Sequence, residues 1–262
     1  MTLRWALADS WTITLRAVSH WARQPGLVIM GLTFPLLLLV MFAYLFGGGM
    51  TVPGGGDYRE FLVPGLFAVT MFFGLESTMT AVNADAARGV TERFRSMPMA
   101  SSAVVAGRSA ADMLFSVVGL AVLVGAGLLV GWQWNEGLGN ALHAFALLLL
   151  LRFAFIWVGI YLGLVVKGQE SLAMVQVLVW PFAALSSTFT STEHMPDWLG
   201  TVADWNPLSA TLNATRELFG NPGFGGDSWI AQHGELMALV WPLVIVAVFF
   251  PLSVRAYRAL GS

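Results

Sequence analysis

Two ionisable residues, Glu76 and Arg152, interrupt long apolar stretches and are the first candidates for chemistry in this sequence. A charged side chain at the centre of a membrane costs about 2.5–3.5 kcal/mol on insertion scales, so a functional role is the default expectation. The two could form an ion pair, but their depths agree poorly. Glu76 lies about seven residues, roughly 10 Å, from the end of its stretch, and Arg152 about 14 residues, roughly 21 Å. The alternative is that Glu76 faces a wet cavity or polar neighbours and that Arg152 holds helices together.

Catalytic and metal-binding motifs are absent from the sequence. The chain has no cysteine, and its four histidines are scattered without the H-E-x-x-H spacing or another zinc-ligand pattern. It also lacks the G-x-S-x-G elbow that carries a nucleophilic serine. We therefore expect no catalytic residue and no metal site in this chain.

A nucleotide site of the P-loop type is excluded by the single lysine. The motif requires a lysine directly after a glycine, whereas Lys167 follows Val166 and precedes Gly168. If the protein pumps a substrate, either another polypeptide binds the ATP or an ion gradient supplies the energy.

Composition places almost the whole chain in or against a membrane. Hydrophobic residues make up 57% of the 262 positions and charged residues 11%, compared with roughly 45–50% and 25% in soluble domains. Six stretches approach the roughly 20 apolar residues that a spanning helix needs. They are residues 26–46, 61–82, 110–131, 141–166, 171–190 and 235–254. We predict an all-α membrane protein with one domain, residues 1–262, and six transmembrane helices.

The distribution of basic residues predicts the orientation. Ten Lys and Arg residues lie in the connections on one side, and two, Arg59 and Arg216, lie on the other. By the positive-inside rule both termini are cytoplasmic. Twelve of the thirteen basic residues are arginine, which is typical of a GC-rich bacterial genome, so we expect a bacterial cytoplasmic membrane.

Three segments outside the spans are more than turns. Residues 1–25 place apolar side chains on one helical stripe, which predicts an amphipathic helix in the cytoplasmic interface. Residues 83–109 form a cytoplasmic segment that contains a cluster of charges. The external segment, residues 192–234, includes a helix that we expect to begin at Asn206-Pro207 and to end at Gly220. Its apolar face would lie on the outer leaflet or dip into it.

Two further patterns concern helix packing. Pro181 interrupts the fifth span after Trp180, and hydroxyl residues follow it, which suits a helix lining a cavity that opens and closes or, equally, a tolerated structural kink. The spacings Gly127-x-x-x-Gly131 and Gly159-x-x-x-Gly163 match the pattern of closely approaching helices.

The order of these features resembles the type-2 ABC transporter permeases, particularly the drug exporters of the daunorubicin-resistance kind. The similarity covers essentially the whole chain. Its most specific parts are Arg88-Gly89 with the following residues 92–98, the stretch from Asn206-Pro207-Leu208 to Arg216, and Phe61-Leu62-Val63-Pro64-Gly65.

The resemblance implies a half-permease that pairs with a second copy or a sibling permease. It also implies two copies of a separate ABC ATPase, which would bind the ATP and Mg, so this chain itself would hold no cofactor. Segment 83–109 would carry the coupling helix that enters a groove of the ATPase. The residues implied there are Arg88, Glu92, Arg93, Phe94, Arg95, Met97 and Pro98. Charges would pair at the rim of the groove, Phe94 and Met97 would fill an apolar pocket, and Pro98 would end the helix.

In related exporters the second and fifth spans line the substrate path. The resemblance therefore implies five path residues, whose alternative role is ordinary helix packing: Phe72, Phe73, Glu76, Trp180 and Phe182. We predict ATP-driven export of a hydrophobic or amphipathic compound, such as a drug, antibiotic or lipid-like molecule, by alternating access, with no nucleic-acid partner. Export of a lipid-linked glycan or polymer precursor is an alternative with the same architecture. A non-transporting scaffold or an intramembrane enzyme is an alternative of another class.

Overall fold

The computed structural model describes residues 12, 14, 15, 19, 23, 25–45, 57–89, 101–188, 195–223 and 228–259, and the structural statements below concern these residues. All regular structure in this part of the chain is helical, which confirms the all-α prediction. The helices are α2 (Pro25–Leu45), α3 (Tyr58–Ala87), α5 (Ser101–Leu129), α6 (Gly137–Val165), α7 (Gln169–Ala184), α8 (Asp197–Asp204), α9 (Pro207–Phe219), α10 (Trp229–Gln232) and α11 (Gly234–Ala259). Most of the predicted interfacial helix 1–25 and residues 90–100 of the coupling segment lie outside the described residues.

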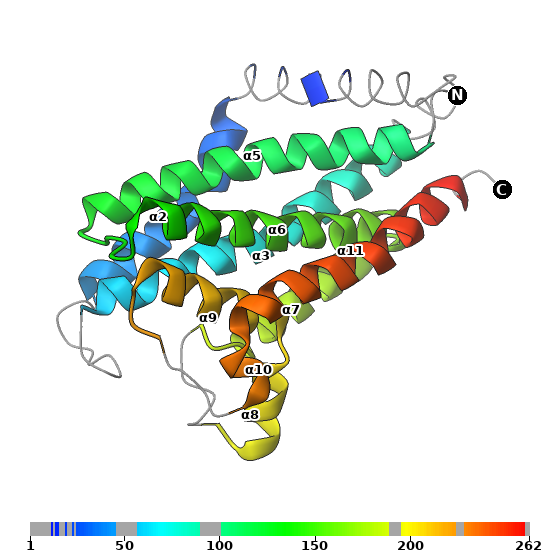
Figure 1. Cartoon of the computed structure of the whole chain (residues 1–262). Helices are drawn as coiled ribbons and strands as arrows, with labels where there is room; N and C mark the ends of the chain where they lie inside the picture. Colours follow the sequence, from blue (N-terminus) through cyan, green and yellow to red (C-terminus); the bar gives the residue numbers. More distant parts are fainter. Residues whose placement is uncertain are drawn as a thin grey trace.

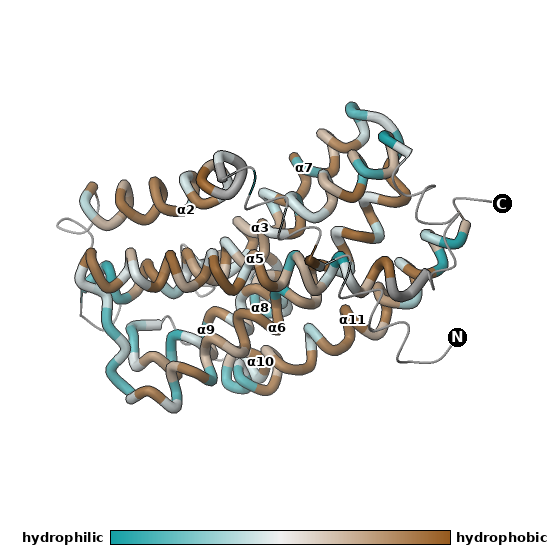
Figure 2. The backbone as a smooth tube through the Cα atoms, turned by 90° about the horizontal axis from the view of Figure 1, so that it is seen from above, coloured by the Kyte–Doolittle hydropathy of each residue, from teal (hydrophilic) through white to brown (hydrophobic). Residues whose placement is uncertain are grey.

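Helix α6 is the centre of the bundle, with α3, α5 and α11 packed against it and α2 against α3 and α5 (Figure 1). The helices share two ends. The basic end, where α3 and α6 finish, carries Arg88, Lys167 and Arg258, and the acidic end, where they begin, carries Asp57 and Glu136. Figure 2 shows hydrophobic residues along most of α2 and α11.

Four helices are long and apolar enough to cross a membrane, and they correspond to the second, third, fourth and sixth predicted spans. The apolar windows of α5 and α11 are only 33% and 22% buried. Such exposed apolar surface is what contact with lipid requires. The first span corresponds to a shorter apolar helix, Ile29–Leu45, and the fifth to the 16-residue α7, so six spans remain a prediction.

Several helix ends differ from the bounds of the predicted spans. Helix α5 begins at Ser101 instead of residue 110, and α11 ends at Ala259 instead of residue 254. Helix α3 continues to Ala87, beyond the predicted end at residue 82, and its last turn is closed by bonds from the Arg88 and Gly89 amides to the carbonyls of Ala84 and Ala86. Helix α7 ends at Ala184 rather than at residue 190. It stops there because side chains, and not the next helical amides, donate hydrogen bonds to its last carbonyls. The Ser186 hydroxyl donates to the carbonyl of Ala183, and the Asn206 side chain donates to those of Phe182 and Leu185.

The external segment contains the predicted helix, α9, with the predicted caps. The Asn206 side chain accepts a hydrogen bond from the Leu208 amide, Pro207 is the first helical residue, and Gly220 adopts the left-handed conformation with φ of 66°. The expectation that the apolar face of α9 lies on or in the outer leaflet was wrong. This face packs inside the protein, where α9 contacts α6 and α11, and its four side chains are each 0% exposed: Leu208, Leu212, Thr215 and Phe219. Two short helices, α8 and α10, were not predicted, and Figure 1 shows them on the side of the molecule away from α5.

Gly159 and Gly163 allow the backbones of α6 and α3 to touch, as the spacing predicted. A Cβ atom at Gly159 would lie 2.8 Å from the Leu75 carbonyl oxygen, and one at Gly163 would lie 2.6 Å from that of Met79. These distances are too short for any side chain, and backbone atoms cannot move away cheaply. We therefore treat α3 and α6 as one tightly packed pair.

Replacing Gly163 by alanine should destabilise the protein by about 1–3 kcal/mol, because the new methyl group forces the two backbones apart. Gly125→Ala is the matched control, since nothing lies within 4 Å of a Cβ atom at this position of α5. The unfolding temperature in detergent should fall for Gly163→Ala only. Equal unfolding temperatures for the two variants would show that α3 and α6 are not in backbone contact.

Candidate functional site

Aromatic side chains join α3 to α7, and four of them were predicted as path residues. Phe72 stacks on Phe182 with ring centroids 5.3 Å apart, and Phe73 contacts Trp180 at 4.5 Å. Phe155 of α6 packs edge-on against Phe72, with the ring centroids 4.8 Å apart. Phe72 is buried, whereas Trp180 and Phe182 are 51% and 40% exposed. The cluster therefore presents apolar rings on an open face of α7.

Glu76, the fifth predicted path residue, lies between two contacts that join α3 to α7. Phe73 contacts Trp180 one turn before it, and Thr80 accepts a hydrogen bond from Gln176 at 3.1 Å one turn after it. The Glu76 side chain is half-buried, and its Oε1 atom has no hydrogen-bond partner among the described residues. We call Phe72, Phe73, Glu76, Trp180 and Phe182 the α3–α7 seam.

Arg152 is the centre of a buried polar network that joins α3, α5 and α6. Its Nε donates to the Ser116 hydroxyl at 2.7 Å, and its Nη2 donates to the Thr78 hydroxyl at 3.0 Å. Thr78 donates to Asp112 Oδ2 at 2.8 Å, and Ser116 donates to the Asp112 carbonyl at 2.8 Å. All four residues are buried, and Asp112, whose side chain is 11% exposed, is the least buried of them. A buried arginine is tolerated here because these groups supply acceptors and one negative charge.

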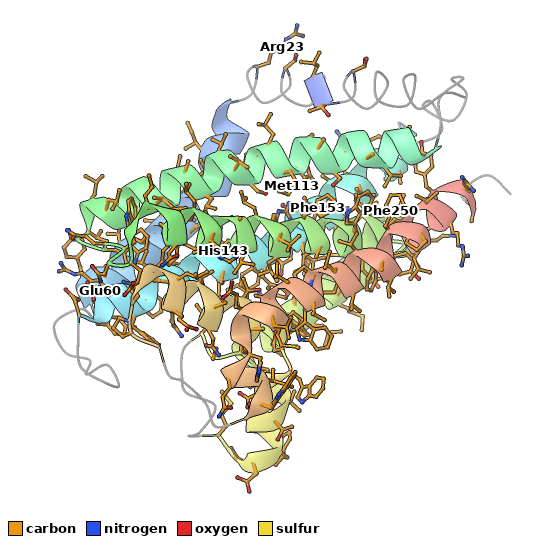
Figure 3. The ribbon with its side chains drawn as sticks, in the orientation of Figure 1. Arg23, Glu60, Met113, His143, Phe153 and Phe250 are labelled. Carbon is orange, nitrogen blue, oxygen red and sulfur yellow. The ribbon has the colours of Figure 1, made fainter. Side chains whose placement is uncertain are left out.

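The polar network lies between two apolar clusters. The larger cluster, on the acidic side, includes Phe67, Leu120 and Leu148, and the smaller one, on the basic side, includes Val105 and Ile156. Met113 and Phe153, labelled in Figure 3, pack against the smaller cluster. The network is thus a polar layer inside an otherwise apolar bundle.

The depth argument against a Glu76–Arg152 pair was wrong, although the described structure contains no such pair. Because α3 extends to Ala87, Glu76 lies deeper than predicted, and Arg152 packs on its neighbours Gly74 and Thr78. A Cβ atom at Gly74 would lie 2.5 Å from Arg152 Cζ. Glu76 is two residues from Gly74, which puts it on a different side of the helix. The alternative role for Arg152, holding helices together, agrees with its contacts.

Ion pairs continue from this network to the basic end. Arg108 Nε lies 3.2 Å from Asp112 Oδ1, and Arg108 Nη1 lies 3.4 Å from Asp85 Oδ2. Arg88 Nη2, on the last turn beyond α3, lies 3.6 Å from Asp85 Oδ1. Of the predicted coupling residues only Arg88 is described. The others, Glu92, Arg93, Phe94, Arg95, Met97 and Pro98, lie outside the described residues and stay predictions.

At the acidic end Arg216 holds α9 against α3 and the residues after α7. It donates to the carbonyls of Phe61, Ser187 and Thr188 at 3.1–3.3 Å, and its guanidinium lies 3.9 Å from the centre of the Phe61 ring. The side chain is 1% exposed. Burial lowers the pKa of Arg216 to about 9, which still leaves it charged at neutral pH.

Asn206 makes the second connection at this end. Its amide nitrogen donates to the carbonyls of Phe182 and Leu185 at 2.9 and 2.7 Å, while its oxygen caps α9. The end of α7 and the start of α9 are therefore joined through one buried side chain.

Sequence reasoning recognised Asn206 as a cap but missed its second role, and it missed the roles of Asp112, Thr78 and Ser116. One signal was available, because Arg108, Asp112 and Ser116 recur every four residues on one face of an apolar helix. Nothing in the sequence distinguishes Arg216 from an arginine on the exposed face of its predicted helix. Among the described residues no group of three or more acidic or histidine side chains could hold a metal ion.

Comparisons with known proteins were made with the whole chain. The model of a family described as ABC-2 type transporter matches residues 9–219. The daunorubicin resistance ABC transporter permease protein of Streptomyces coeruleorubidus is 34% identical over 97% of this chain and 88% of its own length. A putative transport permease of Porphyra purpurea is 29% identical over 76% of this chain and 69% of its own length. A putative transport permease of Pyropia yezoensis is 28% identical over 90% of this chain and 84% of its own length.

Proposed function

This chain belongs to the ABC-2 type transporter family of membrane permeases, and from that premise we propose that it is the membrane subunit of an ATP-driven exporter of hydrophobic or amphipathic compounds. The family implies an ABC ATPase as partner, which agrees with the missing P-loop in this sequence. One relative, 34% identical over 97% of this chain, is named for resistance to daunorubicin, which supports a drug-like substrate.

The observation that carries the proposed substrate class is the α3–α7 seam. Two helices that are separated by about a hundred residues bring four aromatic rings together, and two of the rings are 40–51% exposed. Flat apolar rings bind flat apolar molecules by stacking, and they tolerate different ones. Glu76 adds one polar group with an unpartnered oxygen to this surface, which is the composition of a typical ligand site.

The proposed mechanism needs two permease chains and two ATPase subunits. In this proposal both termini and residues 90–100 face the cytoplasm in a bacterial membrane, and ATP and Mg stay on the ATPase. Closure of the ATPase pair pushes on the coupling segment of each permease, and the seam changes from facing inward to facing outward. Substrate and ATP then influence each other through one coupled equilibrium.

The test of this function is reconstitution of the permease with its ATPase in lipid vesicles. Reversing the charges of Glu92, Arg93 and Arg95 should abolish substrate-stimulated ATP hydrolysis, because the ion pairs with the ATPase become repulsive. Reversing the charges of Arg255 and Arg258, which are exposed at the basic end, should leave the substrate-stimulated ATP hydrolysis within about twofold of wild type. A wild-type permease that binds no ATPase, or transport that responds only to a lipid-linked glycan, would overturn the proposal.

Truncating an exposed ring of the seam tests the substrate class separately. Trp180→Ala should lower the apparent affinity for an aromatic substrate by about tenfold, since a stacked aromatic contact contributes about 1 kcal/mol or more. Trp198→Ala is the control, because Trp198 is 70% exposed on α8, outside the seam. Affinity is measured as the substrate concentration that half-maximally stimulates ATP hydrolysis. An equal effect of both variants would remove the seam from the substrate path.

A further inference from the structure

A continuous series of charged and polar side chains runs from the coupling segment to the centre of the bundle, and we infer that Asp112 and Arg152 are positioning residues that carry movement of this segment into the α3–α6 pair. The inference rests on the proposed function, because it assigns a role in coupling to ATP hydrolysis. The contacts of the series are all made by described residues, on the helices that flank residues 90–100 and on α6.

The outer half of the series ties together the two helices that flank the coupling segment. Asp85 of α3 lies between Arg88, at 3.6 Å, and Arg108 of α5, at 3.4 Å. Arg108 then reaches Asp112 on its own helix at 3.2 Å. Charges alternate in sign at every step, so α5 cannot slide along α3 without bringing like charges together.

The inner half of the series connects Asp112 to Arg152 through two hydroxyl groups. Asp112 Oδ2 accepts from Thr78, which accepts from Arg152, while Ser116 accepts from Arg152 and donates to the Asp112 carbonyl. Asp112 therefore stands between two arginines, one toward the basic end and one in the bundle centre. From Arg88 to Gly74, where Arg152 packs, α3 rises by roughly 21 Å, which is more than half of the apolar thickness of a membrane.

Arg152 connects this series to the most rigid part of the bundle. It lies directly on Gly74, and about two and three turns further along α6 the backbones of α3 and α6 meet at Gly159 and Gly163. A shift of α5 that moves Asp112 is therefore transmitted to a pair of helices that can respond only as one body. Phe72 and Phe73 of the seam directly precede Gly74 in α3, so movement of the pair moves one wall of the proposed substrate path.

Burial makes the inner contacts the strong ones. Asp112 is 8% exposed and Arg152 is 2% exposed, while the side chains of Arg108 and Asp85 are 27% and 36% exposed. Water screens the outer ion pairs, whereas the buried contacts have no alternative partner. Transmission should therefore depend on Asp112 and Arg152 and much less on Asp85.

The experiment compares Asp112→Asn, Arg152→Gln and the double variant in vesicles with the ATPase, and it measures both the unfolding temperature and the substrate moved per ATP. Asp112→Asn should lower the unfolding temperature, because it leaves the buried Arg152 without a nearby negative charge. Arg152→Gln should lower it less, since Asp112 keeps its ion pair with Arg108 at 3.2 Å. The double variant removes both charges and should recover most of the stability. Its substrate moved per ATP should nevertheless stay about tenfold or more below wild type. Asp85→Asn, whose ion pairs are screened by water, should lower the substrate moved per ATP less than either buried variant does. Asn140→Ser, at an exposed position of α6 outside the series, is the control and should leave both quantities unchanged.

A double variant that recovers both stability and the wild-type transport ratio would overturn the inference, since the network would then only stabilise the fold. If the charge variants do not fold, Thr78→Val gives the same comparison, because it removes the bridging hydroxyl and keeps the shape and both charges. A normal transport ratio with Thr78→Val would equally overturn it. Failure of the proposed function is distinguishable, because it would already appear as missing ATPase binding by the wild-type permease.

Discussion

Replacing Arg216 by methionine should destabilise the protein by more than about 3 kcal/mol, the largest stability effect that we expect for a single substitution. The arginine makes four hydrogen bonds to three carbonyl groups that belong to α3 and to the residues after α7. Each buried carbonyl that loses its partner costs about 1–3 kcal/mol. The contact with the Phe61 ring at 3.9 Å is lost as well. The measurement is thermal unfolding of the purified protein in detergent.

Two further variants separate the causes. Arg216→Lys keeps the charge but offers a single ammonium group in place of a planar fork, so it should recover only part of the stability. Arg255→Met is the control, because this arginine is exposed on α11, and it should unfold like wild type. If Arg216→Met also unfolded like wild type, the connection between α9, α3 and α7 would not stabilise the fold.

The second large effect is expected for Asn206→Ser, which should cost about 2–4 kcal/mol. Serine keeps a hydroxyl that can cap α9, but it has no amide group to reach the carbonyls of Phe182 and Leu185, which are 2.9 and 2.7 Å from Asn206. Both carbonyls lie at the end of α7, where the helix provides no partner of its own. Asn206→Ala should be worse by about 1 kcal/mol, since it also removes the cap.

Asn140→Ser is the matched control, because Asn140 is exposed on α6. Hydrogen exchange localises the effect: with Asn206→Ser the amides near the end of α7 should exchange faster, while those of α3 should not. Unchanged exchange in α7 would mean that its end is held by other contacts. This outcome would also remove the physical reason that we give for the early end of α7.

The apolar stretches and the caps were readable from the sequence because they depend on neighbouring residues. A spanning helix satisfies its own backbone groups, so about 20 apolar residues in a row are sufficient to predict one. The cap of α9 likewise needs only Asn206, Pro207 and Gly220, which lie within one helix length. The same locality explains why one of the two glycine spacings was right, since Gly159 and Gly163 define one small-residue face of α6. The other spacing was wrong, because Gly131 lies beyond the end of α5 and has φ of 98°.

The family was predicted from the order of these local features and from three motif regions, and the comparisons confirm it. The ends of α3 and α7 were mispredicted because they depend on contacts elsewhere in the chain. Hydropathy reports only whether a segment is apolar. The last turn of α3 is polar but helical, whereas Leu185 after α7 is apolar but lies outside the helix.

The six apolar stretches, the missing P-loop and the capped external helix were determined by the sequence alone, because each depends on residue type and short spacing. The tertiary structure decided the roles of the charged residues inside the bundle. Arg216 finds its partner carbonyls at Phe61, 155 residues away, and at Ser187 and Thr188, and Arg152 finds its hydroxyl partners 74 and 36 residues away. A buried charge is stable only where several distant segments bring acceptors together, and no local pattern records which segments will meet.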